Sequence, residues 1–268
     1  MFPRITPLLV LLATAMVQGC GDSPELAGPS SRSPQARKPG VAADLLVSVA
    51  GPTVLNTGNA NDFTRPLGMN AVGAAVATVV TFVNLDAQDV RVLRWPRSSA
   101  TGIDIGTEHA TAASINSSGQ IGGTVAGQAM LWTPMHGGTY QLTPVAGAIS
   151  TLAWQSEVRA INDYGQVVGT YSSPKLGTRC FLWTPTSANA TTGKLTVIPG
   201  LGGSFCSANA VNSAGYVAGE SSIPSELEKH VFVWSPATPN GITGSVGDVA
   251  PGCPGGANAI NDALQIGG

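Results

Sequence analysis

Apolar residues alternate with polar or small ones in short runs along most of the chain, and glycine, proline or asparagine bounds each run. Alternation with a period of two predicts β-strands that bury one face. The segment 160–170, AINDYGQVVGT, places two such runs on either side of Asn162-Asp163-Tyr164-Gly165. Asparagine at the first position and glycine at the fourth favour a type I turn. The segment therefore predicts a β-hairpin.

This hairpin pattern recurs along the chain at a nearly constant interval. The turn asparagines are 46, 50 and 49 residues apart: Asn116, Asn162, Asn212 and Asn261. The turn glycine recurs in the first three copies: Gly119, Gly165 and Gly215. Leu264 takes its place in the last copy, so we expect that turn to be either rebuilt or strained.

A second mark keeps step with the asparagines. It is an apolar strand that ends in tryptophan with a proline two places on, and its copies are 51 residues apart: Trp132, Trp183 and Trp234. A fainter copy of both marks lies upstream at Asn70 and Trp95. Two independent marks that preserve their order indicate a structural repeat.

Each repeat is long enough for four short strands. The hairpin supplies two, the tryptophan segment a third, and a stretch such as 194–198 (KLTVI) a fourth. Small residues alternate on the incoming strand, as at Ala208 and Ala210, which fits a centre where several strands converge. These features predict an all-β fold for residues 43–268, a β-propeller or incomplete propeller of four-stranded blades, with about four to five repeats of 46–51 residues.

The sequence contains five expected hairpins and four expected tryptophan strands, so one hairpin has no tryptophan strand to follow it. Two explanations are open. Strand 44–49 (DLLVSV) supplies the missing strand and closes a five-bladed ring, or the chain is truncated before a further tryptophan strand. Truncation is slightly favoured, because nothing near residue 44 resembles a tryptophan strand. An incomplete ring would leave two open strand edges.

Residues 1–19 have the layout of a secretory signal, with Arg4 followed by an apolar run shorter than the roughly 20 residues of a membrane-spanning helix. The ending Val17-Gln18-Gly19-Cys20 resembles the lipobox of bacterial lipoproteins. This resemblance implies that Cys20 carries the lipid and that the protein is anchored in the cell envelope, at the outer membrane or the extracellular surface. The alternative is an ordinary cleaved signal. Residues 20–42, rich in proline, serine and glycine, predict a disordered tether.

Composition narrows the fold and the partners further. Charged residues make up 10% of the chain, against about 25% in an average soluble domain, and 34 glycines and 19 prolines supply turn residues. This composition argues against a helical bundle. The formal net charge is −2 and no cluster of lysine or arginine stands out, which argues against a nucleic-acid partner.

The repeat resembles the HAF repeat of extracellular bacterial proteins, which is named for a His-Ala-Phe strand leading into Leu-Trp. Segment 230–234 (HVFVW) is the nearest copy of that strand. Segments 104–107 (DIGT) and 199–204 (PGLGGS) are similar to the family's DLGTLGG stretch, which also precedes a hairpin. The resemblance covers residues 69–268. It implies an extracellular repeat domain and carries no activity.

Three cysteines follow the leader: Cys180, Cys206 and Cys253. An export signal makes disulfides permissible. We expect one bridge and one free thiol, with Cys206 bonded to Cys180 or to Cys253. The cysteines form no CxxC pair, so we predict no metal site.

The sequence also predicts no catalytic residue and no cofactor. Of the three histidines, His109 and His136 fall in expected loops, and His230 heads a strand where packing explains it. Two function classes remain. One is a surface-exposed or periplasm-facing lipoprotein, held at the membrane by its lipid anchor, that acts as a binding or structural module for a glycan or an envelope protein. The other is a secreted propeller enzyme, a polysaccharide lyase or hydrolase.

The scarcity of ionisable residues in the repeats favours the binding module. The charged insertion 221–230 (SSIPSELEKH) is the first place where we expect ligand contacts.

Overall fold

The computed structural model describes residues 57, 62–82, 88–97, 99–106, 109–145, 155–224 and 228–268. The leader, Cys20, the tether and strand 44–49 lie outside these residues. The described part of the chain consists of strands and their connections, without a helix. Accordingly, it contains no helix long and apolar enough to span a membrane.

The strands form four four-stranded antiparallel sheets and one two-stranded sheet, each with its strands in chain order. The first sheet contains β1 (Asp62–Met69), β2 (Ala75–Phe82), β3 (Gln88–Trp95) and β4 (Ile103–Asp104). The second sheet contains β5 (Ala110–Ile115), β6 (Ile121–Val125), β7 (Gln128–Pro134) and β8 (Tyr140–Pro144). The third sheet contains β9 (Gln155–Ile161), β10 (Val167–Ser173), β11 (Gly177–Pro185) and β12 (Gly193–Ile198). The fourth sheet contains β13 (Cys206–Val211), β14 (Val217–Ser222), β15 (Lys229–Pro236) and β16 (Gly244–Asp248), and the fifth contains β17 (Ala259–Ile260) and β18 (Ile266–Gly267).

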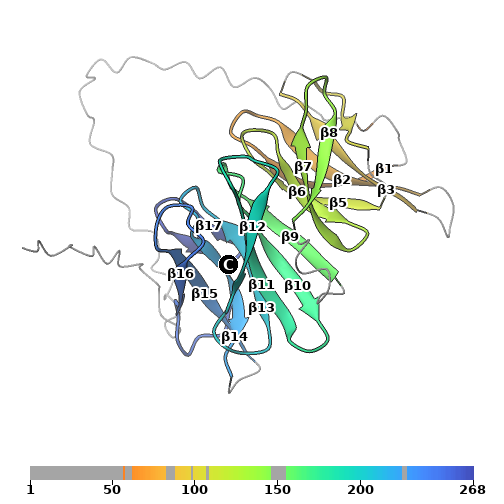
Figure 1. The fold of residues 1–268 in the computed structure, drawn as a ribbon. Coiled ribbons are helices and arrows are strands. Elements are labelled where there is room, and N and C mark those ends of the chain that lie inside the picture. The colour runs from red at the N-terminus through yellow and green to blue at the C-terminus, as the bar shows by residue number, and fades with distance from the viewer. Residues whose placement is uncertain are drawn as a thin grey trace, which may run out of the picture.

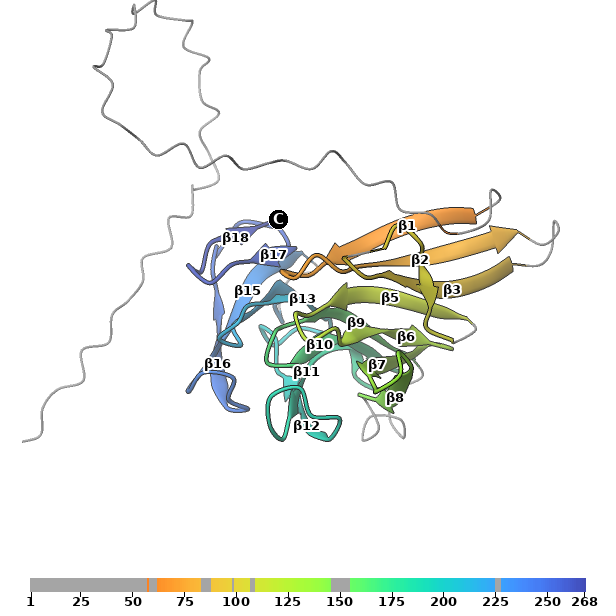
Figure 2. The same ribbon diagram turned by 90° about the horizontal axis from the view of Figure 1, so that it is seen from above.

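The expectation of an all-β fold built from four-stranded units is confirmed. Each expected hairpin forms the first two strands of a sheet, the tryptophan strand is the third, and the expected strand 194–198 lies within β12. The sheets follow one another around an arc, from β1–β4 to the β17–β18 hairpin (Figures 1 and 2). The first strand of each sheet packs against the sheet before it.

The hydrophobic core lies between successive sheets. Each repeat tryptophan is buried against the preceding sheet: Trp132 clusters with Val92, Trp183 with Leu131, and Trp234 with Leu182. A single sheet cannot cover both of its apolar faces, so each repeat depends on its neighbours for burial. Trp95 of the first sheet is also buried, on the face of that sheet opposite the second.

In the second, third and fourth sheets a glycine follows the turn asparagine by seven residues: Gly123, Gly169 and Gly219. Its recurrence has a steric cause. The first strand of each of the second, third and fourth sheets carries a β-bulge three residues before the asparagine. The glycine lies opposite this bulge. A Cβ atom at Gly169 would lie under 3.0 Å from the carbonyl oxygen of Glu157, and Gly219 meets the carbonyl of Ser207 in the same way. In these sheets the bulge therefore leaves no room for a Cβ atom, whereas the first sheet accommodates Ala77 opposite its own bulge.

Candidate functional site

The turn asparagines form a ladder that joins the sheets. The side-chain amide Nδ2 of each donates a hydrogen bond to the main-chain carbonyl of the asparagine in the next sheet. The donor–acceptor distances are 2.8 Å for Asn70 to Asn116, 3.1 Å for Asn116 to Asn162, 2.9 Å for Asn162 to Asn212 and 3.2 Å for Asn212 to Asn261. The predicted turn residues thus connect repeats as well as closing hairpins.

The side-chain oxygen Oδ1 of each asparagine stabilises the turn that this asparagine begins. Asn162 Oδ1 accepts the backbone N–H of Gln166 at 2.9 Å, and the same bond recurs in all five hairpins. The fourth residue of each turn, such as Gly165, donates its N–H to the asparagine carbonyl. Asn162 is 5% exposed, so these bonds satisfy groups that are shielded from water.

Two buried glutamines extend the ladder inside the sheets. Gln120 donates to the hydroxyl of Thr133 at 3.1 Å and to the carbonyl of Asn189 at 3.0 Å. Gln166 repeats the arrangement with Thr184 at 3.0 Å and Asn240 at 3.2 Å. The acceptors Asn189 and Asn240 adopt φ of 59° and 56°, the left-handed conformation that asparagine tolerates.

Acidic turn residues add a second link between neighbouring hairpins. Asp163 accepts the backbone N–H of Ser117 at 2.7 Å and its hydroxyl at 3.0 Å. Asp262 accepts the same two groups of Ser213 at 3.0 and 2.7 Å. These bonds hold the pKa of Asp262 below its ordinary value of 3.8. The polar residues that the sequence repeats therefore serve the architecture.

The opposite end of the strands carries a polar hollow between the second and third sheets. Its volume is about 240 Å³, and its lining includes Thr111 and Thr124 from the second sheet and Gln155, Glu157, Thr170 and Ser172 from the third. We call this feature the hydroxyl groove. Its side chains offer hydroxyl, amide and carboxylate groups, which can both donate and accept hydrogen bonds.

Two kinds of polar group line the hydroxyl groove, namely a buried hydroxyl and exposed side chains. Thr124 Oγ1 is buried and has no hydrogen-bond partner among the described residues, although buried hydroxyls are normally bonded. Gln155 and Glu157 alternate with buried residues along β9 and are exposed. Glu157 pairs with Arg159 at 3.2 Å, with both side chains about half exposed. The groove therefore combines an unmet hydroxyl with accessible polar groups.

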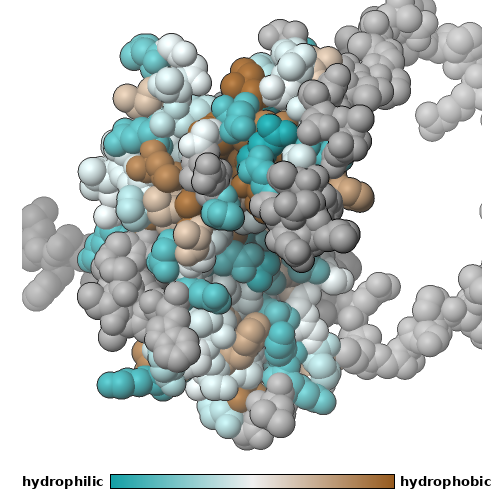
Figure 3. Space-filling model, turned by 90° about the vertical axis from the view of Figure 1, so that its right-hand side faces the viewer, coloured by the Kyte–Doolittle hydropathy of each residue, from teal (hydrophilic) through white to brown (hydrophobic). Residues whose placement is uncertain are grey.

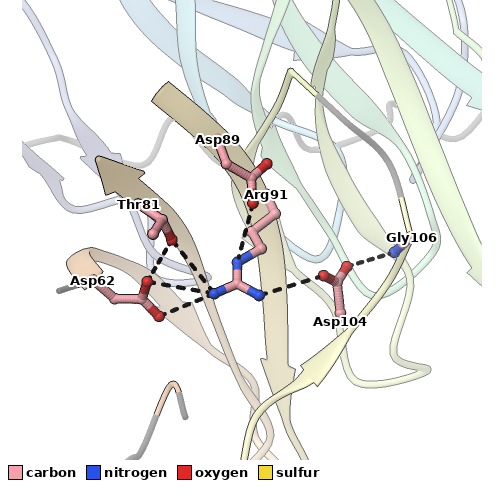
Figure 4. A network of polar contacts seen from close by, with 6 residues as sticks. All are labelled: Asp62, Thr81, Asp89, Arg91, Asp104 and Gly106. Carbon is pink, nitrogen blue, oxygen red and sulfur yellow. Dashed lines mark hydrogen bonds and ion pairs between the residues drawn. The ribbon is translucent and has the colours of Figure 1, made fainter. Parts of the chain in front are cut away.

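A separate polar network links the four strands of the first sheet. Figure 4 shows the guanidinium of Arg91 (β3) among carboxylates, 3.1 Å from Asp62 (β1) and 3.9 Å from both Asp89 and Asp104. The Asp62 side chain is fully buried and is bonded to the hydroxyl of Thr81 (β2). Burial alone would raise the pKa of Asp62, but hydrogen bonds from Thr81 and Thr57 and the charge of Arg91 hold it below 3.8. The network crosses all four strands and stabilises the sheet.

A serine, a histidine and an aspartate fall in line across the fourth sheet. Ser221 (β14) is paired with His230 (β15), whose Nδ1 lies 2.9 Å from Asp248 Oδ2 (β16). The Ser221 hydroxyl is committed elsewhere, because it donates to the carbonyl of Phe205 at 3.0 Å and accepts the N–H of Leu201 at 2.9 Å. His230 is 3% exposed. The contacts of Ser221 fix a loop, and the contact of His230 with Asp248 joins β15 to β16.

The structure contains a disulfide between Cys180 (β11) and Cys206 (β13), with Cα atoms 5.2 Å apart, so the bridge ties the third sheet to the fourth. The expected free thiol is absent from the described residues, because Cys253 is also disulfide-bonded. Cys20, the expected lipid site, lies outside them.

The charged insertion connects β14 to β15, and residues 225–227 within it are not described. Lys229, at its end, pairs with Glu220 at 3.1 Å and stands 4.0 Å from the centre of the Phe205 ring. Both ends of the insertion, 221–222 and 229–230, thus belong to strands of the fourth sheet. His109 and His136 both lie in exposed turns.

Sequence reasoning missed the two glutamines, their asparagine partners and the hydroxyl groove. The recurring Gly-Gln dipeptide at residues 119–120 and 165–166 was a signal for the glutamines. The groove has no such signal, since its residues come from two repeats and differ between them. Comparison of the chain with protein-family models, curated proteins and solved structures gives no match.

Proposed function

We propose that this protein is an envelope-anchored lipoprotein whose HAF-type repeats fold as a β-propeller and act as a binding module for a glycan. The observation that carries the binding function is the hydroxyl groove. The arc of sheets, joined at each step by an asparagine hydrogen bond, supports the propeller. The lipid anchor rests on the lipobox pattern that ends at Cys20.

The groove chemistry suits a polyhydroxylated ligand. Protein sites for sugars need several converging donors and acceptors, and the exposed Gln155, Glu157 and Thr111 provide them beside the unmet hydroxyl of Thr124. The volume of about 240 Å³ lies below the roughly 300–1,000 Å³ of pockets for drug-sized ligands. We therefore expect the groove to hold one sugar residue of a longer glycan.

A glycan array followed by calorimetry tests this function. The full chain, purified in detergent, is screened, and the strongest glycan is titrated against Gln155→Ala and Thr124→Val. Each loss of a hydrogen-bonding group is expected to weaken binding about 5- to 10-fold. Thr143→Val is the matched control, since Thr143 Oγ1 is also buried without a partner in the described part of the chain but lies outside the groove lining.

Three results would contradict the proposal. They are no saturable glycan binding, equal affinity for the groove variants and Thr143→Val, and turnover of a polysaccharide by the purified protein. Turnover would support the enzyme alternative instead.

A further inference from the structure

An arginine takes an apolar position of the repeat at the junction of the first and second sheets. The residue before the repeat tryptophan is aliphatic in the later sheets, as Leu131, Leu182 and Val233, but it is Arg94 in the first sheet. Leu131 packs in the core with Trp183 of the following sheet, and Leu182 is placed in the same way. The repeat takes an aliphatic side chain here, so the fold alone does not account for the charge of Arg94.

The positive charge of Arg94 is uncompensated. Its guanidinium has no hydrogen-bond or ion-pair partner among the described residues. Nε is buried, whereas the terminal nitrogens Nη1 and Nη2 reach solvent. Aspartate and glutamate are absent from the sequence of the loops at this end of the first two sheets, 70–74, 96–102, 116–120 and 135–139. A partly buried cation of this kind is stabilised when an anion pairs with it.

Gly119 locates the guanidinium beside the turn of the second sheet. A Cβ atom at Gly119 would lie 4.0 Å from Nη2 of Arg94. At the matching turn of the third sheet, a Cβ atom of Gly165 would lie 3.1 Å from Asn189, which belongs to the loop after β11. The turn of the fourth sheet has the same kind of contact with Asn240. Arg94 therefore stands where a loop asparagine stands at the later turns.

The loop asparagine supplies an acceptor that the first junction lacks. Asn189 Oδ1 accepts a hydrogen bond from Asn116 Nδ2 at 2.9 Å. The loop of the third sheet closes over residues 186–192, but that of the second closes over 135–139, which is two residues shorter and contains no asparagine. In the described part of the chain, Asn70 Nδ2 accordingly bonds to the main-chain oxygen of Asn116 alone.

Tyr140 (β8) adds a further donor at this place. Its hydroxyl is buried without a partner among the described residues, and the charge of Arg94 acts on it. Burial raises the pKa of Tyr140 above its ordinary value of 10.0, so the hydroxyl keeps its proton at neutral pH. Tyr140 pairs with Pro134, whose ring would lie 3.6 Å from a Cβ atom at Gly119. Donors of three kinds thus gather near the turn 116–119 without an acceptor to match them.

We propose that this junction binds the carboxylate of an acidic sugar, with Nη1 and Nη2 of Arg94 each donating to one carboxylate oxygen. A carboxylate has the planar shape of the asparagine amide that accepts hydrogen bonds at the later junctions, and the guanidinium fork matches its two oxygens. The choice of a sugar rests on the proposed glycan binding, whereas the carboxylate site does not. The hydroxyl groove lies at the other end of the strands and between other sheets.

An NMR titration of the full chain in detergent tests the proposal, with the backbone N–H of Gly119 as the reporter. The probes are glucuronate, acetate and the neutral sugar glucose. We expect saturable shifts with glucuronate and acetate and none with glucose. Arg94→Leu should weaken glucuronate binding at least about 10-fold. Its urea midpoint should not fall, because leucine is the residue that the next two sheets carry at this position.

Two further variants make the test specific. Arg94→Lys keeps the charge and loses the fork, so it should weaken binding about 5-fold, and it carries the test if Arg94→Leu does not fold. Arg97→Leu is the matched control. Arg97 is an exposed arginine at the same end, its side chain lies against Gly73, and its loss should change the affinity less than about 2-fold.

Four results would each overturn the proposal. They are no saturable shift with glucuronate, an equal response to glucose, unchanged affinity in Arg94→Leu, and an equal loss in Arg97→Leu. A response to acetate but not to glucuronate would show that the site excludes sugars and would overturn it as well. Binding at the hydroxyl groove is measured with its own variants, so either proposal can fail alone.

Discussion

Asn162 Nδ2 lies 2.9 Å from the main-chain oxygen of Asn212, a residue fifty positions further along the chain and in the next sheet. This bond is one rung of a ladder that runs from Asn70 to Asn261. One repeated residue therefore closes a turn inside its own sheet and fixes the position of the following sheet. The ladder explains why the chain repeats asparagine at this place.

Replacement of Asn162 by alanine should destabilise the protein by about 2–3 kcal/mol. The change removes the bond to Asn212 and leaves the buried N–H of Gln166 without its acceptor. Urea unfolding followed by tryptophan fluorescence measures the loss. Asn258→Ala is the control, because Asn258 is exposed, and it should change stability by less than about 0.5 kcal/mol. Similar losses of stability for both variants would show that the ladder bonds of Asn162 contribute little to the free energy of unfolding.

Gly169→Ala should prevent correct folding of the third sheet or cost more than about 3 kcal/mol. Its Cβ atom would collide with the main-chain carbonyl of Glu157, which cannot move without loss of the bulge. Gly247→Ala in β16 meets no atom within 4 Å and should be neutral or slightly stabilising. Thermal unfolding of both variants makes the comparison, and a neutral Gly169→Ala would rule out the steric explanation.

Leu264→Gly should stabilise the protein by about 0.5–1 kcal/mol. Leu264 has a φ of 59°, so the last turn keeps the hairpin geometry and is strained rather than rebuilt. The reverse change, Gly165→Leu, should cost more than about 2 kcal/mol, because a Cβ there would lie 2.9 Å from Gln120 Oε1 and 3.1 Å from Asn189. A loss of stability in Leu264→Gly would show that the leucine side chain contributes packing that outweighs the strain.

Acid should weaken the first sheet through Asp62. A carboxyl whose pKa is lower in the folded than in the unfolded state stabilises the fold above its ordinary pKa, here 3.8. That contribution disappears as the pH falls through the lower, folded value. Asp62→Asn should therefore be less stable than the parent at neutral pH and should lose less stability between about pH 4 and pH 2. Parallel pH profiles of the urea midpoint would contradict this role.

Loss of the Cys180–Cys206 bridge should cost about 3–4 kcal/mol, the chain-entropy value for a sequence separation of 26. The double variant Cys180→Ala and Cys206→Ala measures this without reducing the disulfide of Cys253. Calorimetry should show a lower melting temperature. An unchanged temperature would mean that the ladder alone fixes the third and fourth sheets.

The sequence predicted the parts of the fold that depend on residues close together in the chain. Turn chemistry placed the hairpin at Asn162–Gly165, and the apolar pattern placed the strand that ends at Trp183, because both depend on neighbouring residues. The hairpin, the tryptophan segment and a further apolar stretch in each repeat also predicted four strands in each sheet. Local patterns do not show which atom lies across a sheet boundary, so the bond from Asn162 to Asn212 was not foreseen.

The candidate site was less accessible to sequence reasoning. Thr124 and Gln155 come from different sheets, and neither occurs at a repeated position, so only the packing of the sheets brings them to one groove. The first sheet shows a further limit. Its exposed apolar residues include Phe63, Met69 and Val72, and the side of the molecule in Figure 3 mixes hydrophobic with hydrophilic residues, which the strand pattern alone did not reveal.

Asparagine side chains join successive repeats in chain order. Scalar couplings across hydrogen bonds, measured by NMR on isotope-labelled protein, detect each donor–acceptor pair directly. We predict couplings from Nδ2 of Asn70, Asn116, Asn162 and Asn212 to the carbonyl carbon of the asparagine in the following sheet. Side-chain amides that exchange freely with water, or that couple to carbonyls outside this order, would contradict it.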